Sequence, residues 1–135
     1  MKFFISIILI FVSFVGYIRW LEMTEVFFPS KNIKSTPADL GMEYEDIYFQ
    51  TKDKFKINGW LVKGSSDGIV IFFHGNGGNM GNAISKINMF NQLGFNVFSI
   101  DYRGFGKSEG FPTEIGLYRD AQAAYDYLLS RPDVD

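Results

Sequence analysis

The sequence of 135 residues contains no cysteine and only one histidine. The absence of cysteine excludes disulfide frameworks, thiolate metal sites and cysteine nucleophiles. A single histidine without a cluster of other ligands gives no zinc-binding pattern, so we expect no metal site. The net charge is −2, which provides no basic surface for a phosphate backbone. We therefore expect no nucleic acid among the partners.

The chain does have a long apolar run at its N-terminus. Phe3–Ile18 carries no charge and lies between Lys2 and Arg19. A helix that continues to residue 20 would span roughly 27 Å, close to the thickness of a bilayer core. We predict a single-pass membrane anchor over residues 1–20, with residues 3–20 in contact with the lipid bilayer. The charges on its two sides do not indicate which side of the membrane holds the soluble part.

Two other interpretations of this run stay open. A cleaved signal peptide has an apolar region of about 7 to 15 residues that ends in a small-x-small site. The run here is longer and ends in Tyr17-Ile18-Arg19-Trp20, which offers no such site. A core helix buried in the folded domain is the remaining alternative.

Residues 21–41 lose any periodicity and contain two prolines, which is typical of a connector between an anchor and a domain. The folded domain is expected over residues 42–135. Its first two strands are indicated by alternating polar and apolar residues at 44–51 and 55–62, and a polar turn between them predicts an antiparallel hairpin.

The rest of the domain alternates strands and helices. Residues 69–73 and 95–101 are apolar, β-branched or aromatic runs, as expected of strands that are covered on both faces. Apolar residues spaced three and four apart predict helices from Met80 to near Gly94 and from about Thr113 to Ser130. This order of strands and helices along the chain predicts an α/β fold, in which a β-hairpin is followed by β-α-β-α with parallel strands.

A glycine-rich turn, FFHGNGGNMG at residues 72–81, leaves one strand and enters a helix. Such a turn directs main-chain N–H groups at an anion. A dinucleotide site is one interpretation, with Gly75, Gly77 and Asp101, but Met80 stands where the third glycine of the GxGxxG pattern belongs. An oxyanion hole is the other interpretation, which His74-Gly75 directly after the strand favours.

The stretch Gly106–Gly110 matches the GxSxG pattern of serine nucleophiles. A nucleophile elbow joins a strand directly to a helix, whereas Ser108 has neither element beside it. A triad in the order His74, Asp101, Ser108 can also be proposed, because triads are defined by geometry. It would require the short turn at His74 to supply both the base and the oxyanion hole, so we expect Ser108 to serve as a structural hydroxyl.

Three segments together resemble the membrane-anchored Bem46-like branch of the α/β-hydrolase superfamily: HGNGGNMG, DYRGFGKSEG and GLYRDAQAAYDYLLSRPDVD. The resemblance implies a serine hydrolase that acts on esters, thioesters or amides, with a small-molecule or acyl substrate in the full-length relative and no cofactor. It also implies that Asn76 supplies a main-chain N–H to the oxyanion hole. The supporting loop residues that it implies are His74, Gly75, Gly77, Gly78, Asp101 and Arg103.

In that family the nucleophile elbow follows a further strand, which would begin beyond residue 135. The resemblance therefore implies an N-terminal part that lacks the nucleophile, acid and base and is inactive alone. The strand at 69–73 would then have an open apolar edge, and we expect poor solubility. The alternative is a non-enzymatic role, as a membrane-tethered interaction module or a nonfunctional remnant.

Overall fold

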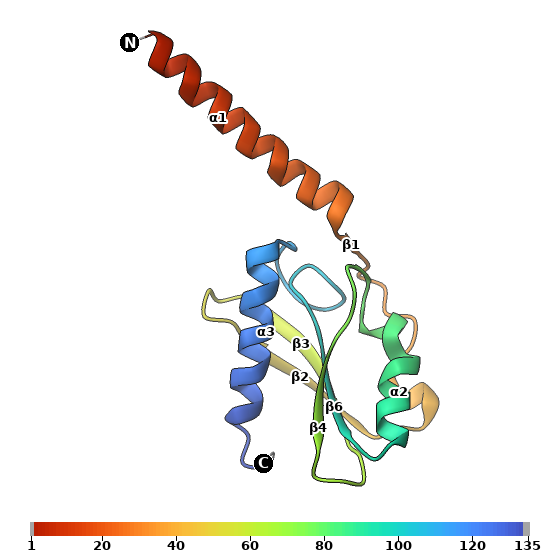
Figure 1. Cartoon of the computed structure of the whole chain (residues 1–135). Helices are drawn as coiled ribbons and strands as arrows, with labels where there is room; N and C mark the ends of the chain where they lie inside the picture. The colour runs from red at the N-terminus through yellow and green to blue at the C-terminus, as the bar shows by residue number, and fades with distance from the viewer. Residues whose placement is uncertain (1, 134–135) are drawn as a thin grey trace.

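The computed structural model describes residues 2–133 and shows a long helix that projects from an α/β domain (Figure 1). Helix α1 spans Lys2–Leu21 and continues as a π-helical turn at Glu22–Val26. The segment Phe3–Val26 contains an 18-residue window with a mean hydropathy of 2.1, so by length and composition it could cross a membrane. None of the apolar window of this helix is buried within the described residues 2–133.

A four-stranded mixed sheet forms the centre of the domain, in the order β2-β3-β6-β4. The strands β2 and β3 form the predicted antiparallel hairpin, and Lys54 in its turn has a left-handed φ of 73°. The strands β4 and β6 are parallel, as predicted. The bounds are β2 Tyr44–Gln50, β3 Lys56–Val62, β4 Ile69–Phe73 and β6 Asn96–Asp101.

The two helices α2 (Ile84–Gln92) and α3 (Glu114–Leu129) cover opposite faces of the sheet (Figure 1). Side chains alternate between the two faces along each strand, so the sheet has two apolar cores. The core on the α3 side contains Ile57, Leu61, Phe98, Ala124 and Leu128 among others. The core on the α2 side contains Trp60, Val62, Met80, Ile87 and Val97 among others.

The helix boundaries follow from their capping residues. The segment predicted to be helical from Met80 begins as a 3-10 helix at Met80–Ala83, capped by the Asn79 side chain, which accepts from the N–H of Gly81. Only the part from Ile84 onward is α-helical. Thr113 caps α3 by accepting from the N–H of Gly116, so the predicted limits of this helix coincide with its two capping residues.

The connector contains more structure than its sequence indicates. The short strand β1 (Phe28–Pro29) pairs in parallel with β5 (Gly77–Gly78) in the glycine-rich turn, and a 3-10 helix spans Pro37–Leu40. These elements are too short for any periodicity, which is why the sequence pattern missed them. The connector is thus packed onto the domain directly beside the glycine-rich turn.

The strand β4 lies at one edge of the sheet and, among residues 2–133, pairs only with β6. Its side chains are half-buried, and Phe73 at its end is 39% exposed. The open apolar edge expected from the sequence is therefore present in the described part of the chain.

Candidate functional site

Two loops leave the same end of the sheet and lie against each other. Residues 74–79, the β4 loop, follow β4, and residues 102–112, the β6 loop, follow β6. Because the two strands are parallel and paired up to Phe73 and Ile100, their carboxyl ends coincide. Ligands bind at this end of the strands in open α/β sheets. The ring of His74 lies 5.1 Å from the rings of both Tyr102 and Phe105.

The buried side chains of His74 and Asp101 meet at the start of the β4 loop. The Nδ1 atom of His74 donates to the carbonyl oxygen of Gly75 over 2.7 Å, and Nε2 lies 3.2 Å from Oδ1 of Asp101. The same Oδ1 accepts the N–H of Met80 at 2.7 Å. Both side chains are buried, and this carboxylate joins the end of β6 to the helical turn that follows the β4 loop.

Asn76 is held in place by the connector. Its carbonyl oxygen accepts the N–H of Phe28 at 2.8 Å, and its side-chain amide donates to the carbonyl oxygen of Val26 at 2.7 Å. Its main-chain N–H has no hydrogen-bond partner among residues 2–133, and the residue is exposed. The side chain is therefore occupied, while the main-chain donor is available to an external acceptor.

The glycines of the β4 loop differ in what they require. Gly78 has a left-handed φ of 79°, and a β-carbon there would overlap the side chain of Asn82. That side chain accepts the N–H of Asn79 through Oδ1 at 3.0 Å, so Gly78 permits the cap that begins the helical turn. Around Gly75, in contrast, nothing lies within 4 Å of such a β-carbon.

The structure places Ser108 beneath the β6 loop, where it is only 2% exposed. Its hydroxyl donates to the carbonyl oxygen of Asp101 and accepts the N–H of Asn58 at 2.9 Å. It makes no hydrogen bond to His74. Because the hydroxyl both donates and accepts a buried hydrogen bond, it ties the β6 loop to β3. It is not placed to attack a substrate.

Arg103 pairs with two aspartates that are distant from it in the sequence. It donates to Asp120 on α3 from Nε at 3.0 Å and from Nη2 at 2.8 Å, and to Asp53 from both Nη atoms. Its guanidinium also lies 4.5 Å from the ring centre of Phe55. The Arg103 guanidinium holds the pKa of Asp53 well below its ordinary value. Arg103 thus attaches the β6 loop to α3 and to the β2–β3 turn.

Two connector residues that the sequence did not single out contact the loops: Ser30 contacts both of them, and Lys31 contacts the β6 loop. The carbonyl oxygen of Ser30 accepts the N–H of Gly106 and the side-chain amide of Asn79, each at 3.0 Å. Lys31 donates its ammonium group to the carbonyl oxygen of Ser108 at 2.6 Å. Main-chain acceptors carry no residue-specific signal, so only the structure reveals this role.

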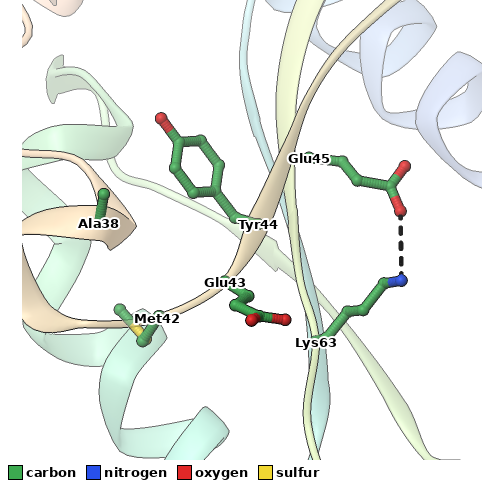
Figure 2. Close-up of a pocket in the computed structure, with 6 residues that line it drawn as sticks. All are labelled: Ala38, Met42, Glu43, Tyr44, Glu45 and Lys63. Carbon is green, nitrogen blue, oxygen red and sulfur yellow. Dashed lines mark ion pairs between the residues drawn. The ribbon is translucent and has the colours of Figure 1, made fainter.

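The opposite end of the sheet has a hollow of about 450 Å³, shown in Figure 2. It is lined by Ala38, Met42, Glu43, Tyr44, Glu45 and Lys63, and Lys63 and Glu45 form an ion pair of 3.9 Å across part of it. These residues come from the start of β2, the segment before it, the 3-10 helix Pro37–Leu40 and the residue after β3, away from the two loops. The hollow therefore does not contribute to the candidate site.

The described residues contain no group of three or more His, Asp or Glu side chains that could hold a metal ion. The dinucleotide interpretation of the β4 loop gains no support from the geometry. Met80, at the position of the missing third glycine, is fully buried in the core on the α2 side. The third glycine of that pattern lets the helix pack closely on the strand, and a methionine side chain at this position does not allow the same approach.

Comparisons with known proteins agree with this geometry. Residues 64–130 match the family described as serine aminopeptidase, S33. The chain is 39% identical to an α/β hydrolase domain-containing protein of Arabidopsis thaliana, over 78% of this chain and 36% of that protein. It is 38% identical to protein bem46 of Schizosaccharomyces pombe, over 87% of this chain and 43% of that protein. A Saccharomyces cerevisiae relative, described as an uncharacterized membrane protein, is 38% identical over 73% of this chain and 36% of its own length.

A solved structure shows the same fold. An esterase of Pyrococcus furiosus superposes with a TM-score of 0.72 at 29% identity, covering 82% of this chain and 44% of the esterase. The chain thus spans less than half the length of the relatives and the solved structure compared here. With the parallel strands, the glycine-rich β4 loop and the β6 loop in the corresponding order, the chain belongs to the α/β-hydrolase superfamily and is Bem46-like.

Proposed function

We propose that this chain provides the anchor and the oxyanion-hole loop of a membrane-bound serine hydrolase that cleaves ester, thioester or amide bonds. The observation that carries the proposal is the main-chain N–H of Asn76 in the loop after β4, which has no hydrogen-bond partner among residues 2–133. Acyl transfer places negative charge on the carbonyl oxygen of the substrate, and a fixed N–H donor stabilises that charge.

The surroundings of Asn76 suit this task because they hold the donor before any substrate arrives. The connector binds the Asn76 carbonyl and side chain, and the hydrogen bond from Nδ1 of His74 to the carbonyl oxygen of Gly75 fixes the residues before it. A donor that needs no reorganisation stabilises a transition state more than the ground state. His74 and Asp101 act in this proposal as supports of the loop rather than as base and acid.

The nucleophile is proposed to come from residues outside this sequence. Ser108 is buried and doubly hydrogen-bonded, and the one histidine is engaged with Gly75 and Asp101. The 135-residue chain alone is therefore expected to be inactive. A fluorophosphonate probe should leave it unlabelled, and labelling that Ser108→Ala abolishes would overturn the assignment.

The role of Asn76 can be tested in a chimera that joins residues 1–135 to the remaining length of the bem46 relative. Asn76→Pro removes the main-chain N–H, and we expect kcat for an ester to fall by roughly 10²–10³. Asn76→Ala is the matched control, because it keeps that N–H and loses only the side-chain bond to Val26. Equal activity of the two variants, with unchanged circular dichroism, would exclude the oxyanion role.

The anchor is proposed from the exposed apolar surface of α1 and from the description of the yeast relative as a membrane protein. The full chain should stay with membranes after extraction at alkaline pH. Ile10→Arg with Phe11→Arg places two charges in the middle of the apolar run and should release it. A shortened soluble product, lacking the first residues, would instead indicate a cleaved signal peptide.

A non-enzymatic interaction module is the second candidate, and the open edge of β4 favours it. An edge strand can pair with a strand from another chain. If the chimera proves inactive with every ester, thioester and amide tested while the chain binds a partner through β4, this candidate replaces the hydrolase.

A further inference from the structure

Five large apolar or aromatic side chains are exposed where α1 joins the domain. They come from the end of the π-helical turn, from β1, from the β6 loop and from the first two turns of α3, and they are 44 to 71% exposed. We call this surface the interfacial patch, and its members are Val26, Phe28, Phe111, Ile115 and Tyr118. In Figure 1 the start of α3 lies at the end of the domain from which α1 projects.

A specific contact fixes α1 next to this patch. The carboxylate of Glu22, which directly follows α1, accepts the N–H of Glu114 at the start of α3 over 2.6 Å. The same carboxylate pairs with Arg19 at 2.7 Å. A carboxylate at a helix N-terminus is favourable because it satisfies a free donor and the helix dipole. The end of α1 is therefore attached to the end of α3.

An apolar crevice makes the surface of α1 continuous with the patch. It has a volume of about 440 Å³ and is lined by Ile18, Leu21, Val26, Phe27 and Ile115, with the Arg19–Glu22 pair and Glu114 at its polar side. Residues from α1 and from α3 thus share one apolar surface.

We propose that the interfacial patch lies in the headgroup layer of the bilayer that α1 enters, so that the domain rests on the membrane by this end. The proposal rests on the anchor role of α1 proposed above. Exposed apolar patches mark contact surfaces, and the crevice that Val26 and Ile115 share with the end of α1 points to lipid as the partner. Aromatic residues favour this layer, because one end of the ring side chain is apolar and the other is polar.

Two aromatic features fit that depth. Tyr118 exposes its ring while its hydroxyl donates to the carboxylate of Glu114 at 2.7 Å. Tyr17 and Trp20, in the last turn of α1, stack with ring centres 6.0 Å apart. The end of α1 and the start of α3 therefore carry the residue types of one interfacial belt.

The position of the patch also sets the direction from which a substrate arrives. Phe28 belongs to the patch, and its N–H donates to the carbonyl oxygen of Asn76. The residue that carries the proposed oxyanion donor is thus hydrogen-bonded directly to a residue of the interfacial patch. This arrangement favours an amphipathic ester or thioester whose apolar chain stays in the bilayer while its carbonyl group reaches Asn76.

The absence of cysteine allows a direct test with the full chain in phosphatidylcholine vesicles. Single cysteines replace Phe111, Ile115, Ile10 or Leu129 and carry a nitroxide label, whose collisions with oxygen and with a water-soluble nickel chelate report its depth. Leu129 is the matched control, since it is 68% exposed on the same helix as Ile115. It lies about 21 Å further along that helix.

We expect a severalfold higher ratio of oxygen to nickel collisions at Phe111→Cys and Ile115→Cys than at Leu129→Cys, and the highest ratio at Ile10→Cys. If Ile10→Cys reports lipid while both patch positions match Leu129→Cys, the docking proposal is wrong and the anchor stands. If Ile10→Cys reports water, both are wrong. Low collision rates with both reagents at the patch would indicate a protein contact and would also overturn the proposal. The two patch positions are independent, so misfolding of one variant leaves the other decisive.

Discussion

The guanidinium of Arg103 and the carboxylate of Asp120 form a buried pair that holds the β6 loop against α3. A second bond reinforces it, because Asp120 also accepts the main-chain N–H of Arg103 at 2.8 Å. The loop that follows β6 is therefore attached to the helix by both its side chain and its backbone.

We expect Asp120→Asn to lower the free energy of unfolding by about 3 kcal/mol, because it leaves the Arg103 charge buried with less compensation. Urea unfolding of the full chain in detergent, followed by circular dichroism, measures this. Asp126→Asn on the same helix is the control. Asp126 is exposed and lies 3.7 Å from Lys52, so its loss should change stability by less than about 0.5 kcal/mol. Equal effects of the two substitutions would contradict the structural role of Asp120.

Substitution by alanine should destabilise the domain at Gly106 but not at Gly75. Gly106 has a left-handed φ of 44°, and a β-carbon there would overlap the carboxylate of Asp101. Gly106→Ala should cost at least about 1 kcal/mol from the backbone alone, and the overlap adds to it. Gly75→Ala meets no atom within 4 Å and should stay within about 0.5 kcal/mol. Thermal unfolding of both variants tests this pair, and a neutral Gly106→Ala is the result that the geometry does not allow.

The stability of the domain should depend on Asp53 in acid. Hydrogen bonds from Arg103 lower the pKa of Asp53 in the folded state, with smaller contributions from Thr51 and Arg119. A lowered pKa contributes stability above the unfolded value near 4, and that contribution is lost as the pH falls below it. Asp53→Asn should therefore be less stable than the wild type at pH 7, and the difference should shrink below pH 4.

Unfolding curves at several pH values measure the effect. Asp67→Asn serves as the control, because Asp67 is exposed and forms no ion pair with residues 2–133. A difference between Asp53→Asn and the wild type that stays constant from pH 7 to pH 3 would rule out this linkage.

The open edge of β4 should cause self-association when α1 is removed. Residues 21–135 should sediment as concentration-dependent species larger than a monomer, because an unpaired apolar strand edge pairs with other chains. Phe73→Lys places a charge at the end of this edge and should reduce the association. Met89→Lys is the same kind of change at an exposed position on α2 and should not. A monomer that melts cooperatively would show that the edge is protected.

Much of the fold could be predicted because its signals are local. The hairpin follows from the alternation of polar and apolar residues, and helix α3 follows from the spacing of its apolar residues and from its capping residues. The order of strands and helices follows from where strand-like alternation gives way to helix-like spacing. The 3-10 start at Met80 was missed because a short tight turn and an α-helix place apolar residues at similar spacing.

The candidate site could be predicted only in part. The motifs identified the residues of both loops, but the partners of those residues are distant in sequence. Asp120 has the ordinary appearance of a helix-surface carboxylate, and nothing local shows that Arg103 reaches it. Such pairings depend on how α3 packs on the sheet, so they become visible only in the structure.

The connector's bonds to the two loops also have a consequence for folding. Asn79 and Ser30 are 49 residues apart, and Ser108 and Lys31 are 77 apart. Closing such long stretches of chain costs more entropy than closing a local turn, and contacts of this kind slow folding. The glycine-rich loop therefore acquires its final shape only together with the rest of the domain, and a fragment containing the loop alone would not reproduce the geometry of Asn76.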